Sequence, residues 1–195
     1  MKRIFDLLFS FLGLVILSPF LLIIAILIVI DSKGDIFYLQ QRVGKDNKDF
    51  NIFKFRTMRP NSDKQGLLTV GAKDSRITRI GVFLRKYKID ELPQLINVLI
   101  GNMSFVGPRP EVRKYVDLYN SEQKKVLTVK PGITDYASIK YSNENELLAK
   151  SENPEKTYIE EIMPAKLELN LKYINDASLL TDIKIIFKTF AKIVS

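Results

Sequence analysis

The sequence of 195 residues contains no cysteine and no histidine. The missing cysteines exclude a thiol nucleophile and a disulfide, and the missing histidines exclude imidazole base catalysis; Cys/His zinc sites are excluded as well. Any catalysis must therefore use Asp, Glu, Lys, Tyr, Ser or Thr side chains. Any bound metal must be held by oxygen atoms, which favours Mg²⁺ or Ca²⁺.

Acidic residues are in the minority. The chain carries 30 Lys and Arg residues against 22 Asp and Glu residues, which gives a formal net charge of +8 at pH 7. A surplus of this size favours an anionic partner, such as nucleic acid, anionic lipid or a phosphorylated substrate. The length of the chain suits one domain that can bury a core.

One long apolar run occupies the N-terminal part of the chain. It extends from Ile4 to Ile30, and Asp6 is the only charged residue within it. The run is long enough to cross a bilayer as a helix. It is too long for the core of a signal peptide, and no small-residue cleavage site follows it. The simplest interpretation is therefore a single membrane-spanning anchor.

Two features of the run favour a different topology. Ser18-Pro19 lies in its middle, and proline removes a backbone donor and disfavours helix at the preceding residue. Lys2 and Arg3 precede the run and the basic remainder of the chain follows it, so a spanning helix would place one positive end on the wrong side. Two arms of about a dozen residues would each extend about 18–21 Å, which is less than the hydrocarbon thickness of about 30 Å. A re-entrant hairpin that breaks at Ser18-Pro19 and a kinked spanning helix both remain open.

The rest of the chain predicts an α+β fold, a mainly helical single domain with a small β-hairpin. The hairpin falls within Ile36–Arg59, where two apolar segments flank the polar sequence KDNKD. The spacing of apolar residues predicts four helices: Ile77–Tyr87, from near Leu92 (with Pro93 in the first turn) to Gly101, Tyr158–Tyr173 and Leu179–Val194. A type II turn is expected at Lys130–Thr134. Loops are expected at Asn61–Ser75 and over 143–156.

The last expected helix, Leu179–Val194, has two interpretations. Lys184, Lys188 and Lys192 form one stripe, and most of the apolar residues lie elsewhere on the helix. Such a helix either packs in the core or lies in a membrane interface. The core interpretation is the preferred one.

The sequence KIDELPQLINVLIGN, Lys88–Asn102, places two adjacent carboxylates, Asp90 and Glu91, at the expected start of a helix. Acidic residues are common there, because they complement the helix dipole and cap free amides. A helix start also attracts phosphate, and a carboxylate beside phosphate can bind a bridging Mg²⁺ or attack the phosphorus. The surrounding segments supply cations that could neutralise a diphosphate: Lys54, Arg56, Arg76, Arg79, Arg85, Lys88 and Arg109. Capping and phosphate chemistry are both open for the acidic pair.

Several motifs together resemble one known family. They are the basic N-terminus with its Ser-Pro-interrupted apolar run, FKFRTM at Phe53–Met58, DELPQLINVLIGNMSFVGPRP at Asp90–Pro110, and KPGIT at Lys130–Thr134. Over nearly its whole length the chain resembles the bacterial sugar transferases, specifically the small monotopic phosphoglycosyl transferases. The long central motif is highly specific, so a chance match is not a reasonable explanation.

The resemblance implies an activity and a location. These enzymes transfer a phosphosugar from a UDP-sugar to a polyprenol (undecaprenyl) phosphate at the cytoplasmic face of the bacterial inner membrane and release UMP, as the first membrane step of a surface glycan or glycoconjugate pathway. The resemblance favours the re-entrant helix over the spanning one, with both termini cytoplasmic. It makes residues 1–32 the membrane-embedded part and 33–195 the catalytic region, continuous with it as one domain. The oligomeric state, including a homo-oligomer, stays open.

The resemblance also implies roles for individual residues. Asp90 is the nucleophile that forms a covalent phosphosugar intermediate, and Asp90 and Glu91 are the expected Mg²⁺ ligands. Phosphate or nucleotide-sugar binding is expected from Lys54, Arg56, Arg85, Pro108, Arg109 and Pro110. Arg109, held between two prolines, suits bidentate phosphate binding.

The chain departs from the family pattern at Asp135–Glu146, where many members continue with Gly-Trp. The transferred sugar therefore cannot be inferred from the family, and we expect this segment to help select it. Two other functions remain as alternatives: another membrane-bound phosphotransferase or phosphatase that uses Asp and Mg²⁺, and a membrane-tethered nucleic-acid binder. The second lacks a recognisable reading helix or aromatic-basic platform, so nucleic acid is not an expected partner.

Overall fold

The structure is a computed structural model that describes residues 1–60, 62 and 74–194. The loop expected at Asn61–Ser75 lies largely outside the described residues. In chain order the elements are α1 (Lys2–Asp31), β1 (Phe37–Val43), η1 (Lys45–Asn47), β2 (Asp49–Phe55), α2 (Arg79–Lys86), η3 (Ile89–Glu91), α3 (Gln94–Ile100), β3 (Ser104–Val106), α4 (Arg113–Val116), η4 (Gln123–Thr128), β4 (Gly132–Thr134), α5 (Tyr136–Lys140), α6 (Glu144–Ala149), α7 (Pro154–Thr157), η5 (Tyr158–Ile162), α8 (Met163–Asn175) and α9 (Leu179–Val194).

The predicted α+β class and the hairpin are confirmed. β1 and β2 pair in antiparallel fashion, with Leu39 opposite Phe53, and together they form a two-stranded sheet. The short turn η1 connects them, and its Asp46 and Asn47 adopt left-handed φ angles of 56° and 60°. Asp and Asn tolerate this conformation better than other non-glycine residues, which explains the polar turn sequence.

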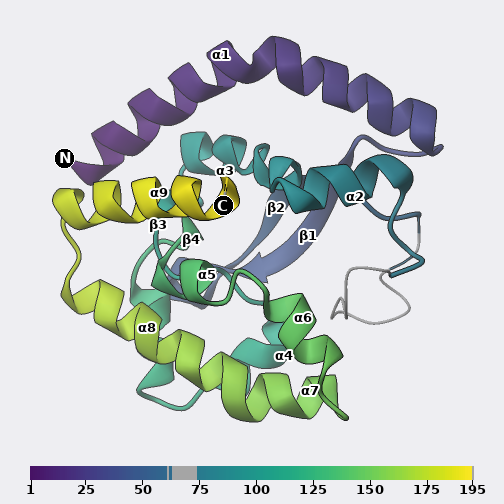
Figure 1. Cartoon of the computed structure of the whole chain (residues 1–195). Coiled ribbons are helices and arrows are strands. Elements are labelled where there is room, and N and C mark those ends of the chain that lie inside the picture. The colour runs from purple at the N-terminus through teal and green to yellow at the C-terminus, as the bar shows by residue number, and fades with distance from the viewer. Residues whose placement is uncertain (61, 63–73, 195) are drawn as a thin grey trace.

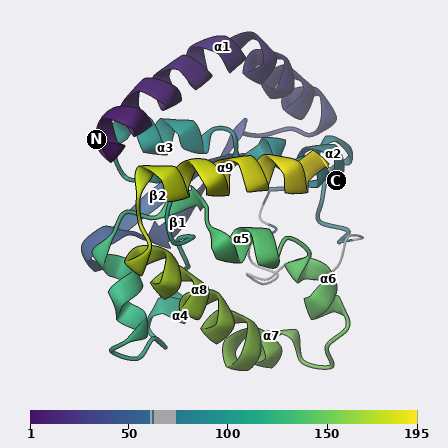
Figure 2. The ribbon, with the colours of Figure 1, turned by 60° about the vertical axis from the view of Figure 1, so that its left-hand side comes forward.

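α1 is continuous from Lys2 to Asp31 and contains Pro19. The predicted helix–break–helix at Ser18-Pro19 is thus not seen as an interruption of the helix. Figures 1 and 2 show α1 bent into an arch over α3, as a proline inside a helix commonly causes. By length and composition, α1 is the helix of the described chain that could cross a membrane.

The N-terminal arm of α1 is tied to the body by partly buried polar contacts. The Lys2 ammonium group donates to the Tyr173 hydroxyl at 2.9 Å and forms an ion pair with Asp182 in α9. Arg3 donates to the carbonyl of Val98 in α3 at 2.6 Å. A cation is therefore fixed to the body at each of the first two positions of the helix.

Further contacts fix the rest of the arch at both ends. Asp6 is buried and accepts a hydrogen bond from the Ser104 hydroxyl at 3.1 Å. At the other end, Ile24 and Ile28 are buried in a cluster with Leu84. The middle of the arch remains exposed and apolar, with large exposed side chains at Phe11, Leu12, Val15, Ile16, Phe20, Leu22 and Ile23.

The predicted type II turn at Lys130–Thr134 is wrong. Such a turn requires a positive φ at Gly132, but Gly132 begins β4 without a left-handed φ. β4 pairs in parallel with β3, and the two backbone segments approach each other closely at Gly107 and Gly132. A Cβ at Gly132 would lie 2.1 Å from the backbone nitrogen of Gly107, so this glycine serves a close approach of two backbones.

The helices expected at Ile77–Tyr87 and up to Gly101 are confirmed as α2 and α3. The Thr78 hydroxyl caps α2 by accepting from the Gly81 amide at 3.1 Å. α3 ends at Gly101, whose φ is 96°. Asp90 and Glu91 do not lie in α3 itself. They lie in a separate turn, η3, that precedes α3. Lys88, the residue before this turn, has a left-handed φ of 56°.

The segment 143–156, expected to be a loop, instead contains the short helices α6 and α7. Leu148 in α6 is buried in the main apolar cluster together with Tyr158 and Leu167. Helices this short carry too few buried positions to produce an apolar period in the sequence, which explains the error.

The C-terminal helices are confirmed as α8 and α9. In α9 Ile185 is fully buried, whereas Phe187 and Phe190 are 71% and 64% exposed. Neither interpretation of this helix is sufficient alone, because one face packs in the core and another presents aromatic residues to the surroundings. Figure 2 shows α9 running below the arch of α1, on the opposite side of the body from α7.

Candidate active site

Three segments bring the candidate residues together: β2, the turn η3 and the loop after β3. Asn97 in α3 fixes this arrangement, because its amide oxygen accepts from the Phe53 amide at 2.9 Å and its amide nitrogen donates to the Asn51 carbonyl at 2.7 Å. Asn97 is fully buried. It was not among the residues expected from sequence, although a polar residue inside the apolar sequence QLINVLI is a usable signal of a buried polar contact.

Glu91 is held by two cations. Arg109 donates to both carboxylate oxygens of Glu91, at 3.1 Å and 2.5 Å, and the Lys54 ammonium group lies 3.3 Å from one of them. Burial alone would raise the pKa of Glu91, but the charges of Arg109 and Lys54 outweigh it and hold the pKa well below its usual range. Glu91 is therefore an ionised carboxylate in a bidentate pair.

Asp90 has the opposite environment. Its side chain is 7% exposed, and its Oδ1 atom is buried without a hydrogen-bond partner in the described chain. Burial and the negative charge of Glu91 raise the pKa of Asp90 to about 6, against opposing contributions from Lys54 and Arg85. A proton bound by this pair of carboxyl groups resides on Asp90, because Arg109 and Lys54 stabilise the ionised form of Glu91.

The capping hydrogen bond considered for the acidic pair is not made in the structure. α3 receives no side-chain capping hydrogen bond. The oxygens of Glu91 are bound to cations, and Oδ1 of Asp90 has no partner among the described residues. A buried acceptor without a partner costs free energy, so its retention points to chemistry at Asp90.

Lys54 and Arg109 differ in how firmly they hold their protons. Burial lowers the pKa of the Lys54 ammonium group more than Glu91 raises it. The charge of Glu91 raises the pKa of Arg109, against the effect of burial. Arg109 is accordingly a permanent cation at this site.

Arg85 and Arg56 have different places. Arg85, in the last turn of α2, is close enough to lower the pKa of Asp90. The Arg56 guanidinium instead donates to the carbonyls of Ser32 and Lys33 at 2.5 Å and 2.7 Å. It packs so tightly against Gly34 that a Cβ there would lie 2.1 Å from it. The structure thus places Arg56 at the end of α1 and does not bring it to the carboxylates.

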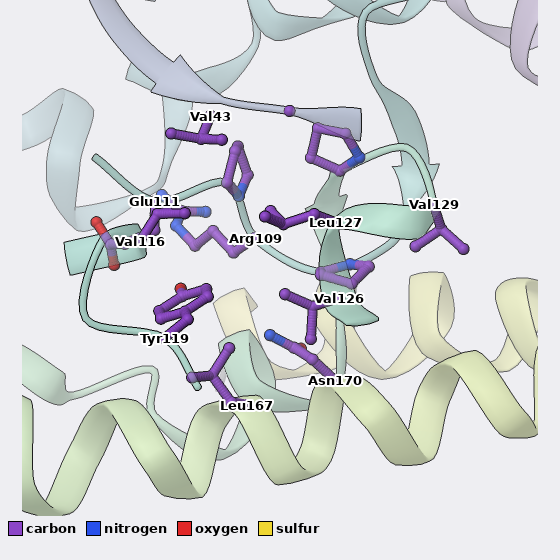
Figure 3. A pocket seen from close by; sticks show the side chains of 14 residues that line it. Val43, Arg109, Glu111, Val116, Tyr119, Val126, Leu127, Val129, Leu167 and Asn170 are labelled. Carbon is purple, nitrogen blue, oxygen red and sulfur yellow. The ribbon is translucent and has the colours of Figure 1, made fainter. Parts of the chain in front are cut away.

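The Pro108–Pro110 loop presents Arg109 from a packed support. Figure 3 shows the space behind the loop, which is closed by Val43, Val126 and Leu167 among other side chains. The cavity left there is about 20 Å³, room for about one water molecule. The two prolines therefore line a packed interior and hold the loop.

Asp135 was not expected from sequence as a site residue, but it contacts the loop directly. It is fully buried, and its two carboxylate oxygens accept from the Arg109 amide at 3.1 Å and the Ser138 amide at 2.5 Å. Asp135 therefore both caps α5 and fixes the backbone of Arg109. An Asp three residues before Ser138 is a recognisable cap pattern, but its link to Arg109 depends on the parallel β3–β4 pairing.

Asp135→Asn is expected to lower the free energy of unfolding by about 1–3 kcal/mol. The amide presents only one acceptor oxygen, so one of the two backbone donors stays buried and unpaired. Denaturant unfolding of the purified protein measures the effect. Asp46→Asn, at an exposed turn position, is the matched control and should leave stability unchanged. Equal stability of both variants and the wild type would mean that Asp135 does not hold the loop.

The acidic pair offers two carboxylate oxygens that could bind a cation. Oδ1 of Asp90 has no partner in the described chain, and Oε2 of Glu91 accepts only from Arg109, so both oxygens retain acceptor capacity. No group of three or more metal-binding side chains occurs among the described residues. A cation bound here would complete its shell with substrate oxygens and water, which is the usual situation for Mg²⁺.

Comparison with known proteins identifies the family. A family model described as bacterial sugar transferase matches residues 1–195. The chain is 39% identical over 197 residues to a UDP-N-acetylgalactosamine-undecaprenyl-phosphate N-acetylgalactosaminephosphotransferase of Aeromonas hydrophila, with 100% of this chain and 44% of that protein covered. It is 37% identical to a UDP-glucose:undecaprenyl-phosphate glucose-1-phosphate transferase of Klebsiella pneumoniae, with 98% and 39% covered.

A shorter relative matches over most of its own length. The exopolysaccharide production protein PSS of Rhizobium leguminosarum bv. phaseoli is 38% identical, with 97% of this chain and 92% of that protein covered. The chain spans less than half the length of the Aeromonas and Klebsiella proteins. The match to the whole chain shows that it belongs to the bacterial sugar transferase family.

Proposed function

We propose that the chain transfers a phosphosugar from a UDP-sugar to a polyprenol phosphate such as undecaprenyl phosphate, and that it releases UMP. The names of the Aeromonas and Klebsiella relatives support the donor and acceptor classes. The observation that carries the proposal is the buried, unpartnered carboxylate oxygen of Asp90 beside the Glu91–Arg109 pair. A screen of UMP release over UDP-N-acetylgalactosamine, UDP-glucose and other UDP-sugars, with undecaprenyl phosphate as acceptor, tests it.

In the first step Asp90 acts as the nucleophile. Its carboxylate oxygen attacks the sugar-bearing phosphorus, a bond forms between them, and the bond from that phosphorus to the bridging oxygen breaks. UMP leaves with the bridging oxygen and the electron pair, and the phosphosugar remains on Asp90 as an acyl phosphate. Carboxylates are effective nucleophiles only when ionised, so Asp90 must lose its proton before it attacks.

Fixed cations lower the cost of bringing a diphosphate to two carboxylates. Lys54 and Arg85 act on Asp90, and Arg109 supplies a planar guanidinium that suits phosphate oxygens. Glu91 holds Arg109 in place before the substrate arrives. Mg²⁺ held by Asp90 and Glu91 would supply charge neutralisation of the diphosphate and the leaving UMP.

In the second step the acceptor phosphate attacks the acyl phosphate. One of its oxygens forms a bond to the sugar-bearing phosphorus, the bond from that phosphorus to Asp90 breaks, and the carboxylate is regenerated. The acceptor phosphate is already an anion, so this step needs no strong base. A chain without histidine can therefore complete the reaction.

The first step is expected to slow as the pH falls through about 6. The pKa of Asp90 is raised to about 6, so protonation removes the nucleophile below that pH and the rate reaches a plateau above it. UMP release without acceptor is the measurement, because a UDP-sugar does not titrate in this range. Glu91→Gln removes the negative neighbour and should move the midpoint to lower pH. A midpoint that does not move would assign the pH dependence to another group.

We also propose that α1 enters the membrane without crossing it, with both termini on the cytoplasmic side of the bacterial inner membrane. Both ends of α1 contact the same body: Lys2 binds Tyr173 and Asp182, and the Asp31 carboxylate accepts from the Ile80 amide at 3.0 Å. A spanning helix would carry one end about 30 Å away, across the hydrocarbon layer. The exposed apolar middle of the arch then lies in lipid, and Phe187 of α9 lies at the interface.

Cysteine labelling in intact cells tests this topology cleanly, since the chain has no native cysteine. Ile4→Cys and Asp35→Cys place exposed thiols at the first residue of the apolar run and after its end. We expect a membrane-impermeant maleimide to label neither variant in intact cells and both after lysis. Labelling of one variant in intact cells would mean that α1 spans the membrane.

A further inference from the structure

A recess lies where the end of α1 meets the start of α2, near the right-hand end of the arch in Figure 1. Its volume is about 920 Å³. None of the carboxylates or cations of the candidate active site lines it. The lining side chains are Leu27, Ile30, Asp31, Ser32, Lys33, Arg59, Pro60, Thr78, Arg79, Ile80 and Phe83.

Three cations around the recess have no acidic partner among the described residues. Lys33, Arg59 and Arg79 are exposed, and no carboxylate of the described residues forms an ion pair or a hydrogen bond with any of them. Nearby Arg76, by contrast, is paired with Asp74 at 2.6 Å. These three side chains therefore offer free donors to an anion.

The one acidic residue in the lining does not neutralise these cations. Asp31 accepts a hydrogen bond from the Ile80 amide at 3.0 Å and forms no ion pair in the part of the chain that the structure describes. One negative charge remains against three positive ones, so the recess favours an anion.

The wall of the recess towards α1 is apolar. Leu27, Ile30 and Phe83 are 39%, 76% and 46% exposed. Leu27 and Ile30 belong to the same helix as the exposed apolar middle of the arch, so this wall continues the surface proposed to lie in lipid. An apolar wall beside unpaired cations matches an amphiphile that has a phosphate head and a hydrocarbon tail.

We propose that this recess binds the headgroup phosphate of an anionic membrane phospholipid, with the acyl chain against Leu27, Ile30 and Phe83. The proposal rests on the membrane placement of α1 proposed above. Arg59 and Arg79 bind the phosphate through their planar guanidinium groups, and Lys33 adds a point charge. The lipid thereby holds the second end of the arch at the membrane surface, whereas partly buried polar contacts tie the first end to the body of the protein.

The bound lipid is distinct from the reacting acceptor. Arg79 is the first of the eight residues of α2, and the turn that carries Asp90 follows the end of that helix, so about 12 Å along the helix axis separate the two. A phosphate held by Arg79 therefore lies at the end of α2 away from the Asp90 carboxylate. The recess therefore suits a resident lipid that is not consumed.

Lipid binding to the full-length protein in neutral detergent tests the proposal without any UDP-sugar. The probe is dioctanoyl phosphatidylglycerol, and its affinity is measured by titration calorimetry. Dioctanoyl phosphatidylcholine tests the net charge, dioctanoylglycerol tests the tail alone, and inorganic phosphate tests the anion alone. We expect measurable binding of phosphatidylglycerol and at least about tenfold weaker binding of the other three.

Matched variants locate the binding. The triple variant Lys33→Gln/Arg59→Gln/Arg79→Gln is expected to bind phosphatidylglycerol at least about tenfold more weakly than the wild type does. The control, Lys124→Gln/Lys150→Gln/Lys172→Gln, removes the same charge at exposed positions on other elements and should bind as the wild type does. Equal weakening in both triple variants, or equal binding of inorganic phosphate and phosphatidylglycerol, would overturn the proposal.

Two readouts separate this proposal from the proposed function. Thermal unfolding shows whether the triple variant is folded, and Leu27→Ser provides a second variant that weakens the apolar wall while the cations stay. Arg79 was one of the cations expected from the sequence to neutralise a diphosphate, but the structure places it at the recess and not among the charges that act on Asp90 and Glu91. UMP release from a UDP-sugar without acceptor should therefore persist in the triple variant. Loss of lipid binding with retained UMP release is the expected combination. A chain that releases no UMP in any form but binds the lipid would contradict the proposed function alone.

Discussion

Asp90→Asn is expected to abolish UMP release, with a rate about a thousandfold or more below that of the wild type, as is common when a nucleophile is removed. An amide cannot attack phosphorus in place of a carboxylate, and the residual cations cannot supply a substitute. The measurement is UMP formed from a UDP-sugar, both with and without acceptor. Retention of a substantial rate would mean that Asp90 is not the nucleophile.

The same variant is expected to unfold at a higher temperature than the wild type at pH 7. In the folded chain the pKa of Asp90 is raised from 3.8 to about 6, so keeping it ionised at pH 7 costs about 3 kcal/mol relative to the unfolded chain. Asn removes that cost. The gain should be full above pH 6, shrink as folded Asp90 becomes protonated, and vanish near pH 4.

Asp35→Asn is the matched control for the stability measurement. Asp35 is exposed, so its replacement should not change the unfolding temperature. Loss of activity together with a gain in stability would separate removal of the nucleophile from misfolding. A destabilised Asp90→Asn variant would contradict the environment assigned to Asp90.

Arg109 should give the second largest effect. Arg109→Ala removes the bidentate partner of Glu91 and leaves that partly buried carboxylate with Lys54 alone. Breaking a fully buried pair on one side costs about 3–5 kcal/mol of stability; the Arg109 side chain is 32% exposed, so we expect a smaller loss of about 1–3 kcal/mol. The double variant Glu91→Gln/Arg109→Ala removes the stranded charge as well and should recover part of this loss in denaturant unfolding.

The conservative variant distinguishes charge from geometry. Arg109→Lys keeps the positive charge but cannot reproduce the planar fork. We expect a fall in kcat/KM of about tenfold or more, or about 1.4 kcal/mol of transition-state binding. Lys54→Arg at the neighbouring cation is a useful comparison, because Lys54 makes a single contact with Glu91. Near-normal activity of Arg109→Lys would reduce its role to general positive charge.

Elements with many periodic positions could be predicted from the sequence. The hairpin, α2, α3, α8 and α9 all show alternating or helical spacing of apolar residues, and the structure contains each of them. The parallel pairing of β3 with β4 could not be predicted, because three-residue strands have no readable period. Gly107 and Gly132 indicate this pairing only after the close approach of their backbones is known.

The sequence predicted which residues belong to the candidate site better than it predicted which of them contact one another. Lys54 and Arg56 share a strand face by spacing, but Arg56 follows the last residue of β2 and turns to the carbonyls after α1. The bidentate contact between Glu91 and Arg109 joins residues 18 positions apart, and no local pattern specifies it. Asp135 was likewise visible only as part of a divergent segment, although its contact with the Arg109 amide links that segment to the site.

The division of labour between the adjacent carboxylates follows from their surroundings. Glu91 is ionised and occupied by Arg109 and Lys54, whereas Asp90 keeps an unpartnered oxygen and a raised pKa. A pair with different environments can take different roles. These surroundings support the proposal that Glu91 positions Arg109 and that Asp90 is the group that reacts.

The amount of UMP released in the absence of acceptor tests this account most directly. Enzyme and UDP-sugar are mixed without polyprenol phosphate, UMP is quantified against active sites, and the digested protein is examined by mass spectrometry. A covalent intermediate predicts close to one UMP per active site and a phosphosugar adduct on the peptide that contains Asp90. No UMP until the polyprenol phosphate is added, together with initial-rate plots that intersect, would mean that transfer is direct and that Asp90 is not the nucleophile.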